Sequence, residues 1–167
     1  LESYKRGDCP DCQYYIADDE AENKILFSKK KLINKAIVTF ENLTPTKARQ
    51  VARLMGVSVS DNSTDEYIYN QMDTILKSPE FTKGDYEGLS TISVFNDIIA
   101  LTDDRLSTKD LVKQAIRHNI YRTGPGGVIL EGSETKAATE GDLVTYLLEP
   151  KNQKELIVLE KRVKDKS

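Results

Sequence analysis

Lys109–Pro150 reads KDLVKQAIRHNIYRTGPGGVILEGSETKAATEGDLVTYLLEP and carries the strongest structural pattern in the chain. Apolar residues recur at helical spacing over residues 111–116, and again over residues 140–148 up to the helix-breaking Pro150. Between these segments, glycine and proline at residues 123–127 separate two short β-prone runs, which predicts a hairpin with a long loop. We therefore expect a helix–hairpin–helix unit in the C-terminal half.

The ends of the first predicted helix are marked by polar residues. We expect Ser107 or Thr108 to cap it, because a hydroxyl at that place accepts from a free backbone N–H. Asp110 then lies near the positive end of the helix, and Asn119 is the expected stop. The glycines that follow have neither P-loop nor dinucleotide-binding spacing, so we interpret them as a turn that needs positive φ angles. A helix followed by such a hairpin resembles winged-helix modules, and that resemblance implies contact with nucleic acid or another protein.

The composition limits the possible functions. The 167 residues, 38% of them hydrophobic, are enough for one domain or two small ones. A net charge of −3 gives no general attraction to nucleic acid, so any phosphate contact must come from a local basic patch. The sequence has no apolar run as long as a membrane span and no signal-peptide core. These features predict a cytoplasmic or virion-associated protein that is not secreted and has no membrane partner.

Cys9 and Cys12 form a C-x-x-C motif, for which three interpretations stay open. Two thiolates at this spacing can bind one zinc ion, but a tetrahedral site needs two more ligands, and the chain offers only His118 and carboxylates. The motif also resembles the redox pair of glutaredoxin-like proteins, which implies Cys9 as nucleophile and Cys12 as resolving thiol. The third interpretation is a turn with two ordinary thiols, in a protein from a reducing compartment.

The segment after the cysteines is strongly charged. The acidic run Asp18–Glu22 lacks the central glycine of a calcium loop, so we interpret it as a solvated turn. Short β-prone runs at Ile25–Phe27 and Ala36–Phe40 predict two strands, and thus a small β-containing unit near the N-terminus. Between them lies the densest basic cluster of the chain, a candidate phosphate contact formed by Lys29, Lys30 and Lys31.

Residues 43–77 show the pattern of two amphipathic helices joined by an extended link. Pro45 lies near the start of the first helix, and Gly56 marks its end. Ser63 or Thr64 is the expected cap of the second helix. A turn this long argues against a compact helix-turn-helix motif.

This arrangement is similar to the SAP and LEM family of helix–extended loop–helix modules. The residues that carry the resemblance are Leu43, Thr44, Ala48, Val51, Leu54, Gly56, Val57, Val59, Ser60, Ile68 and Leu76. Members of that family bind DNA or protein without catalysis, so the resemblance implies a small interaction module. DNA contacts would then come from the first helix, through Lys47, Arg49 and Arg53.

The remaining pattern completes the predicted domain organisation. Residues 79–90 carry proline and glycine with little apolar periodicity and are the expected linker. A helix over residues 91–101 is expected to anchor the C-terminal module, and a last helix covers residues 152–163. The predicted fold class is α+β, mainly helical. Its predicted parts are an N-terminal module at 1–78, the linker, and a helix–hairpin–helix, winged-helix-like module at 91–167.

These features favour a non-enzymatic interaction or adaptor protein of a nucleic-acid-handling or virion-type assembly, and the compact, acidic, modular style resembles tailed-phage proteins. The expected partners are other protein subunits, with DNA as a further candidate and no small-molecule substrate. The alternatives are a structural subunit that binds only protein and a thiol oxidoreductase that uses the C-x-x-C pair. The candidate nucleic-acid contacts are Lys29, Lys30, Lys31, Arg49, Arg53, Arg117 and Arg122, and the candidate zinc ligands are Cys9 and Cys12.

Overall fold

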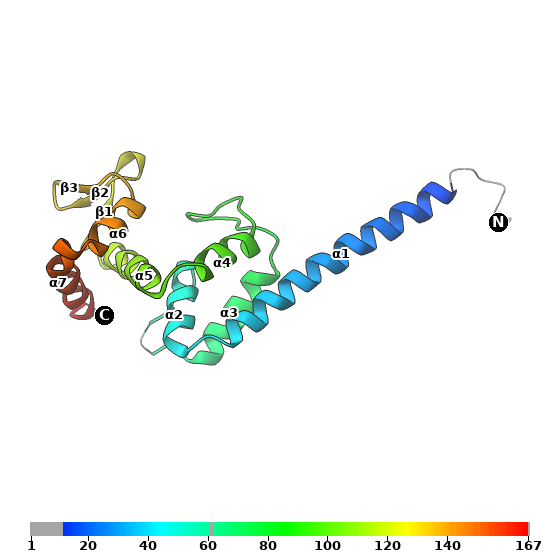
Figure 1. Cartoon of the computed structure of the whole chain (residues 1–167), viewed down its shortest axis with the longest axis horizontal. Coiled ribbons are helices and arrows are strands. Elements are labelled where there is room, and N and C mark those ends of the chain that lie inside the picture. Colours follow the sequence, from blue (N-terminus) through cyan, green and yellow to red (C-terminus); the bar gives the residue numbers. More distant parts are fainter. Residues whose placement is uncertain (1–11, 61, 167) are drawn as a thin grey trace.

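The computed structural model describes residues 12–60 and 62–166, and it confirms a mainly helical α+β fold (Figure 1). The helices are α1 (Cys12–Glu41), α2 (Pro45–Leu54), α3 (Asp65–Lys77), α4 (Thr91–Ile99), α5 (Asp103–Arg117), α6 (Glu140–Leu148) and α7 (Gln153–Lys164). A small antiparallel sheet is formed by β1 (Arg122–Thr123), β2 (Ile129–Glu131) and β3 (Glu134–Ala137). None of the described helices is both long enough and apolar enough to cross a bilayer.

Helix α1 overturns the prediction of two N-terminal strands. Both β-prone runs, at Ile25–Phe27 and Ala36–Phe40, lie inside this single helix of 30 residues. Short apolar runs do not distinguish strand from helix, and no glycine or proline interrupts residues 12–41. Near its C-terminal end, Ala36 and Phe40 fall on one helical face and are buried in the body of the protein.

The first hydrophobic cluster joins the end of α1 to α2, α3 and α4. Thr44, which with Thr46 is one of the two candidates that the sequence offers, caps α2, and Thr64 caps α3, each through its hydroxyl oxygen. The link between these two helices is extended, and its Val57 and Val59 are buried in the cluster. The predicted helix–link–helix arrangement is therefore present, and buried valines fix the course of the link.

Residues 79–90, the predicted linker, run beside this cluster. Two isolated bridges, Glu80 to Ser90 and Phe81 to Glu87, fold the segment back on itself, and Phe81 and Tyr86 pack against the cluster. Helix α4 also packs there, through Val94, Phe95 and Ile98. The expectation that this helix anchors the C-terminal module is wrong, because its contacts are with α1, α2 and α3.

The second hydrophobic cluster holds α5, the sheet, α6 and α7 together. β1 pairs with β2 around the glycine-rich loop, which confirms the hairpin, and Asn119 ends the preceding helix with a φ of 56°. The helix starts earlier than expected, at Asp103 with Thr102 as its cap. It spans both clusters, because Leu106 packs in the first and Val112 in the second. β3 was not predicted.

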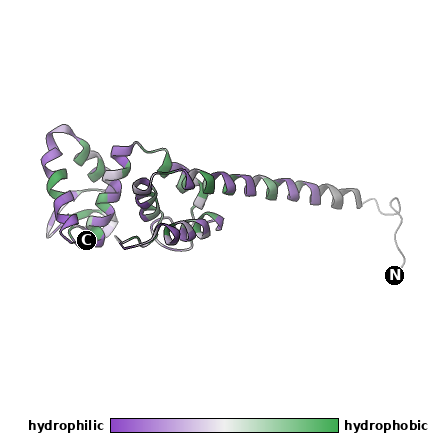
Figure 2. Ribbon diagram, turned by 90° about the horizontal axis from the view of Figure 1, so that it is seen from below, coloured by the Kyte–Doolittle hydropathy of each residue, from purple (hydrophilic) through white to green (hydrophobic). Residues whose placement is uncertain are grey.

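The molecule has a compact part and one long projection. We call residues 19–32 of α1 the arm, and the other described residues from 33 onward the body. Every residue of the arm is exposed, and Ile33 is the first residue of the helix that the body partly covers. Both views show the helix extending away from the body (Figures 1 and 2).

Candidate interaction surfaces

The arm exposes large apolar side chains. Ile25, Leu26, Phe27 and Leu32 are 54–60% exposed, although single exposed apolar residues elsewhere on a protein surface are ordinary. Ile25 and Leu32 share one helical face with Leu26 beside them, whereas Phe27 lies on the other side of the helix. Exposed apolar side chains of this number on one unsupported helix are of the kind that marks an interaction site. Leu26 lies seven residues before the half-buried Ile33, on the same helical face. The face that packs on the body therefore continues uncovered along the arm.

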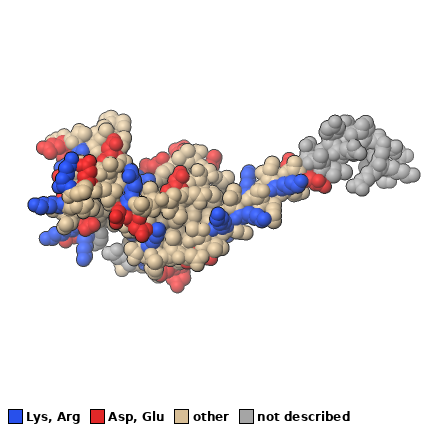
Figure 3. All heavy atoms as spheres, viewed as in Figure 1, with Lys and Arg blue, Asp and Glu red and all other residues tan. Residues whose placement is uncertain are grey.

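The predicted lysine cluster does not form one patch. Successive residues of an α-helix point about 100° apart, so Lys29, Lys30 and Lys31 face three different directions. The ammonium of Lys31 lies 4.8 Å from the centre of the Phe27 ring, four residues earlier. All three lysines are exposed, and Figure 3 shows basic side chains along this part of the helix. They lie among the exposed apolar side chains rather than making a separate surface.

Arg49, a predicted nucleic-acid contact, is used inside the protein. Its guanidinium donates to the backbone oxygens of Ser60 and Ser63, at 3.3 and 2.7 Å, and lies 3.2 Å from an oxygen of Asp65. These bonds connect α2 to the extended link and to the first turn of α3. The side chain therefore holds the helix pair in place.

Arg53, on the same helix, forms a two-point ion pair with Asp110. Its Nε lies 2.7 Å from Oδ1 and its Nη2 lies 2.6 Å from Oδ2, and Gln114 also donates to the carboxylate. Asp110 is only 2% exposed. Burial raises the pKa of Asp110 above its ordinary value, against the hydrogen bonds and charge of Arg53. The pair fastens α2 to α5.

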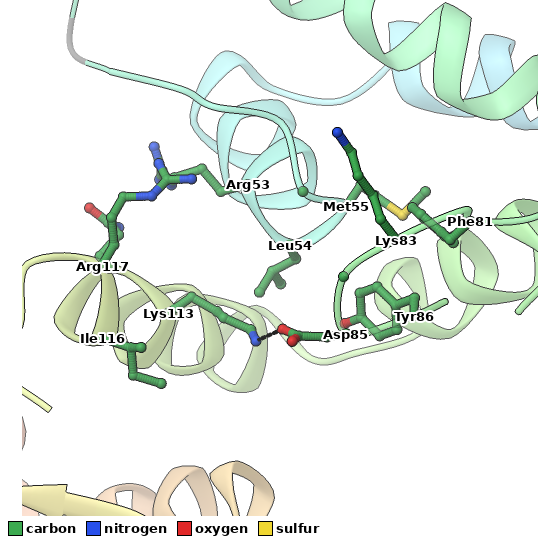
Figure 4. Close-up of a pocket in the computed structure, with 13 residues that line it drawn as sticks. Arg53, Leu54, Met55, Phe81, Lys83, Asp85, Tyr86, Lys113, Ile116 and Arg117 are labelled. Carbon is green, nitrogen blue, oxygen red and sulfur yellow. Dashed lines mark hydrogen bonds and ion pairs between the residues drawn. The ribbon is translucent and has the colours of Figure 1, made fainter. Parts of the chain in front are cut away.

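A pocket of about 440 Å³ lies beside this ion pair, between the end of α2, α5 and the 79–90 segment (Figure 4). Lys113 pairs there with Asp85, and with Glu140 at 2.9 Å. Burial opposes the charge of Lys113, but the hydrogen bonds to these carboxylates outweigh it and raise the pKa of the lysine. Among the described residues, no hydrogen bond or ion pair engages two other cations of the lining, Lys83 and Arg117.

The remaining predicted cations lie in the C-terminal part of the body. Arg117 is exposed at the end of α5, and Arg122 is exposed in β1. Within the described part of the chain, neither side chain forms a hydrogen bond or an ion pair. Figure 1 shows α5 and β1 on the far side of the body from the arm, so the structure does not bring the predicted nucleic-acid contacts together on one surface.

The predicted metal or redox motif cannot be placed. Cys9 lies outside the described residues, and Cys12 is the first residue of α1, at a position where only the backbone is described. Among the residues the structure describes, no three His, Cys, Asp or Glu side chains are grouped closely enough to hold a metal ion. Zinc binding by the C-x-x-C motif stays a prediction.

Sequence reasoning found the basic residues but missed the apolar arm and the Arg53–Asp110 pair. The signal for the arm was available, because no glycine or proline breaks residues 12–41 and apolar residues recur along them. The ion pair left no local signal, since its partners are 57 residues apart. No protein-family model, curated protein or solved structure matches this chain.

Proposed function

We propose that this chain is a non-enzymatic interaction protein that acts as an adaptor in a nucleic-acid-handling or virion-type assembly. In this proposal the arm is the protein-binding contact and the body is the scaffold that carries it. The observation that carries the proposal is the group of exposed apolar side chains, Ile25, Leu26, Phe27 and Leu32, on a helix that leaves the body.

The free energy of burial supports a protein partner for the arm. Removing a large apolar side chain from water contributes about 1.5–3 kcal/mol, so a side chain that is already half covered gains about 1 kcal/mol when a partner covers the rest. Several such side chains on adjacent turns supply a useful part of a binding free energy. Amphipathic helices that dock in this way use anchors at i, i+3, i+4 and i+7 spacing.

A non-catalytic role is supported by what the buried charged groups do. Arg53 and Asp110 join two helices, and Lys113 joins α5 to the 79–90 segment and to α6. Each of these groups is paired with an opposite charge in the protein. Their positions in the fold therefore give these charged groups structural roles in the body.

A second candidate function is direct contact with nucleic acid. It is favoured by Arg117 and Arg122, which are exposed and have no hydrogen-bond or ion-pair partner in the described chain. The exposed lysines of the arm could add to this contact. Arg49 and Arg53 contribute less support, because their guanidinium groups already have partners in the body.

The adaptor proposal is tested by comparing two matched variants in capture experiments. Ile25→Ser/Leu26→Ser removes adjacent exposed apolar residues from the arm, at 56% and 54% exposure. Ile157→Ser/Val158→Ser removes a similar pair from α7, at 61% and 56% exposure. We expect partner proteins to be cross-linked in native cells to the wild-type chain and to the α7 variant, and to be lost from the arm variant. Equal capture by all three chains would overturn the proposal.

A further inference from the structure

We infer that the arm pairs with the arm of a second copy of this chain, and that the two helices run antiparallel. This inference rests on the proposed function, because it identifies a partner for the same surface. It is carried by the distribution of charge along the arm, by the position of its apolar residues and by the place of the body.

Charge is separated along α1 into two blocks. From Cys12 to Asn23 the only charged residues are acidic, and from Lys24 to Phe40 they are all basic. The acidic block is formed by Asp18, Asp19, Glu20 and Glu22, and the basic block by Lys24, Lys29, Lys30, Lys31 and Lys35. Two parallel copies would therefore bring like charges together, and two antiparallel copies bring each block against its opposite.

The apolar residues lie where an antiparallel pair needs them. Ile25 and Leu26 stand midway between Glu22 and Lys29, so pairing about this point puts the apolar residues of the two copies at the centre. Glu22 and Lys29 lie on the same helical face as Ile25 and Leu26, so Glu22 then lies near the second copy's Lys29. By symmetry this ionic contact occurs twice, on both sides of an apolar centre.

The shape of the molecule permits this arrangement. The body begins to cover α1 at Ile33, so the exposed length of the helix lies entirely on the N-terminal side of the body. Antiparallel arms place the two bodies at opposite ends of the paired helices, and pairing is confined to residues 19–32, where α1 is uncovered. Pairing also supplies the tertiary contacts that a helix leaving its domain lacks, since short isolated helices are marginally stable in water.

The first test is the mass of the full chain in solution, measured by light scattering and sedimentation over a range of concentrations. We expect conversion from one chain to two as the concentration rises. Ile25→Ser/Leu26→Ser should weaken the association at least about tenfold, the equivalent of about 1.4 kcal/mol. Ile157→Ser/Val158→Ser should leave it unchanged. A chain that stays monomeric at all concentrations would overturn the inference.

The second test uses charge reversal to establish whether the charges of the arm contribute to the pairing. Asp19→Lys/Glu20→Lys/Glu22→Lys makes the arm basic throughout, and Lys29→Glu/Lys30→Glu/Lys31→Glu makes it mainly acidic. Each variant alone should associate at least about tenfold more weakly than the wild type. An equimolar mixture should recover the association as a heterodimer. If the mixture associates no more strongly than each variant alone, the two charge blocks do not meet.

Salt distinguishes the two directions in the wild-type chain. Antiparallel arms attract through their charges, so sodium chloride should weaken the association. Parallel arms would repel, and salt would strengthen the association by screening that repulsion. Association strengthened by salt would therefore overturn the antiparallel arrangement.

The failure of this inference is distinct from the failure of the adaptor proposal. A monomeric wild-type chain whose cross-linked partners still depend on Ile25 and Leu26 would reject self-pairing and leave the adaptor role standing. A monomeric chain whose partners are the same in the arm variant would reject both.

Discussion

Arg53 and Asp110 face each other across the junction of α2 and α5, with Nε 2.7 Å from Oδ1 and Nη2 2.6 Å from Oδ2. This pair joins the two hydrophobic clusters, because α2 packs in the first and the following turns of α5 pack in the second. Its two-point geometry fixes the orientation of one helix against the other. The relative position of the two halves of the body therefore depends on a polar contact as well as on apolar packing.

Replacing Arg53 by Ala should strongly destabilise the fold. The substitution leaves the carboxylate of Asp110 buried without the guanidinium that pairs with it, which costs about 3–5 kcal/mol in the free energy of unfolding. Lys77→Ala is the matched control, since it breaks the exposed Lys77–Asp73 pair, which contributes about 0.5 kcal/mol or less. Urea denaturation measures both values. Equal, small effects of the two substitutions would show that the buried pair does not stabilise the fold.

The cost of Arg53→Ala should decrease as the pH falls. Burial already raises the pKa of Asp110 above the ordinary 3.8, and loss of Arg53 removes the largest of the contributions that lower it, leaving the hydrogen bond from Gln114 and the charge of Arg117. A carboxyl with a higher pKa in the folded state binds a proton more tightly there, so its unfavourable contribution grows as the pH rises from 3.8 through the folded pKa. Below 3.8 both states are protonated and the penalty disappears. Urea denaturation of the variant and the wild type from pH 7 to pH 4 measures this, and a constant difference would contradict it.

The predictable parts of the fold are those with local signals. Thr44 and Thr64 cap α2 and α3 because their hydroxyls satisfy free N–H groups within the same turn. The glycine-rich loop of the hairpin was predicted because glycine tolerates positive φ angles, and Gly126 and Gly127 adopt such angles in the structure. β3 escaped prediction because its sequence, ETKA, has no alternating apolar side chains.

The parts that escaped prediction depend on contacts distant in the sequence. Asp110 was expected near the positive end of a helix, but α5 begins earlier, at Asp103, so Asp110 lies in its interior and faces Arg53. The contact roles predicted for Arg49 and Arg53 were assigned from their charge and from the resemblance to SAP and LEM modules, without knowledge of the oxygens that surround them. Two strands were predicted within α1 because its short apolar runs were considered separately rather than along the uninterrupted helix.

Arg49→Ala should loosen the extended link without unfolding the body. Its guanidinium donates to the backbone oxygens of Ser60 and Ser63, so its loss removes both bonds and costs about 1–2 kcal/mol, although the Ser60 oxygen still accepts from the Ser63 N–H. Hydrogen exchange of the amides at residues 57–60 should become faster, and urea denaturation should show the loss of stability. Lys47→Ala, on the same helix as Arg49, is the control, since it breaks only the exposed pair with Asp103 of α5. Unchanged exchange in the Arg49 variant would contradict the stabilising role.

If the arm contacts nucleic acid, the salt dependence of binding should reveal it. Each lysine that neutralises a phosphate of duplex DNA contributes about 0.9 to the slope of log K against log salt. Lys29→Glu/Lys30→Glu/Lys31→Glu should therefore reduce the slope by up to about 3. Fluorescence anisotropy with a labelled duplex measures the slope, at protein concentrations where light scattering gives single chains.

The control for this measurement carries the same change of charge at another place. Lys154→Glu/Lys161→Glu/Lys164→Glu reverses three exposed lysines of α7, so both triple variants have the same net charge. A general electrostatic effect lowers affinity equally in the two variants, whereas contact through the arm lowers it more in the arm variant. Equal slopes would remove the arm from the nucleic-acid interface and leave Arg117 and Arg122 as the remaining candidates. Binding with no salt dependence in the wild type would exclude phosphate contact through any of these side chains.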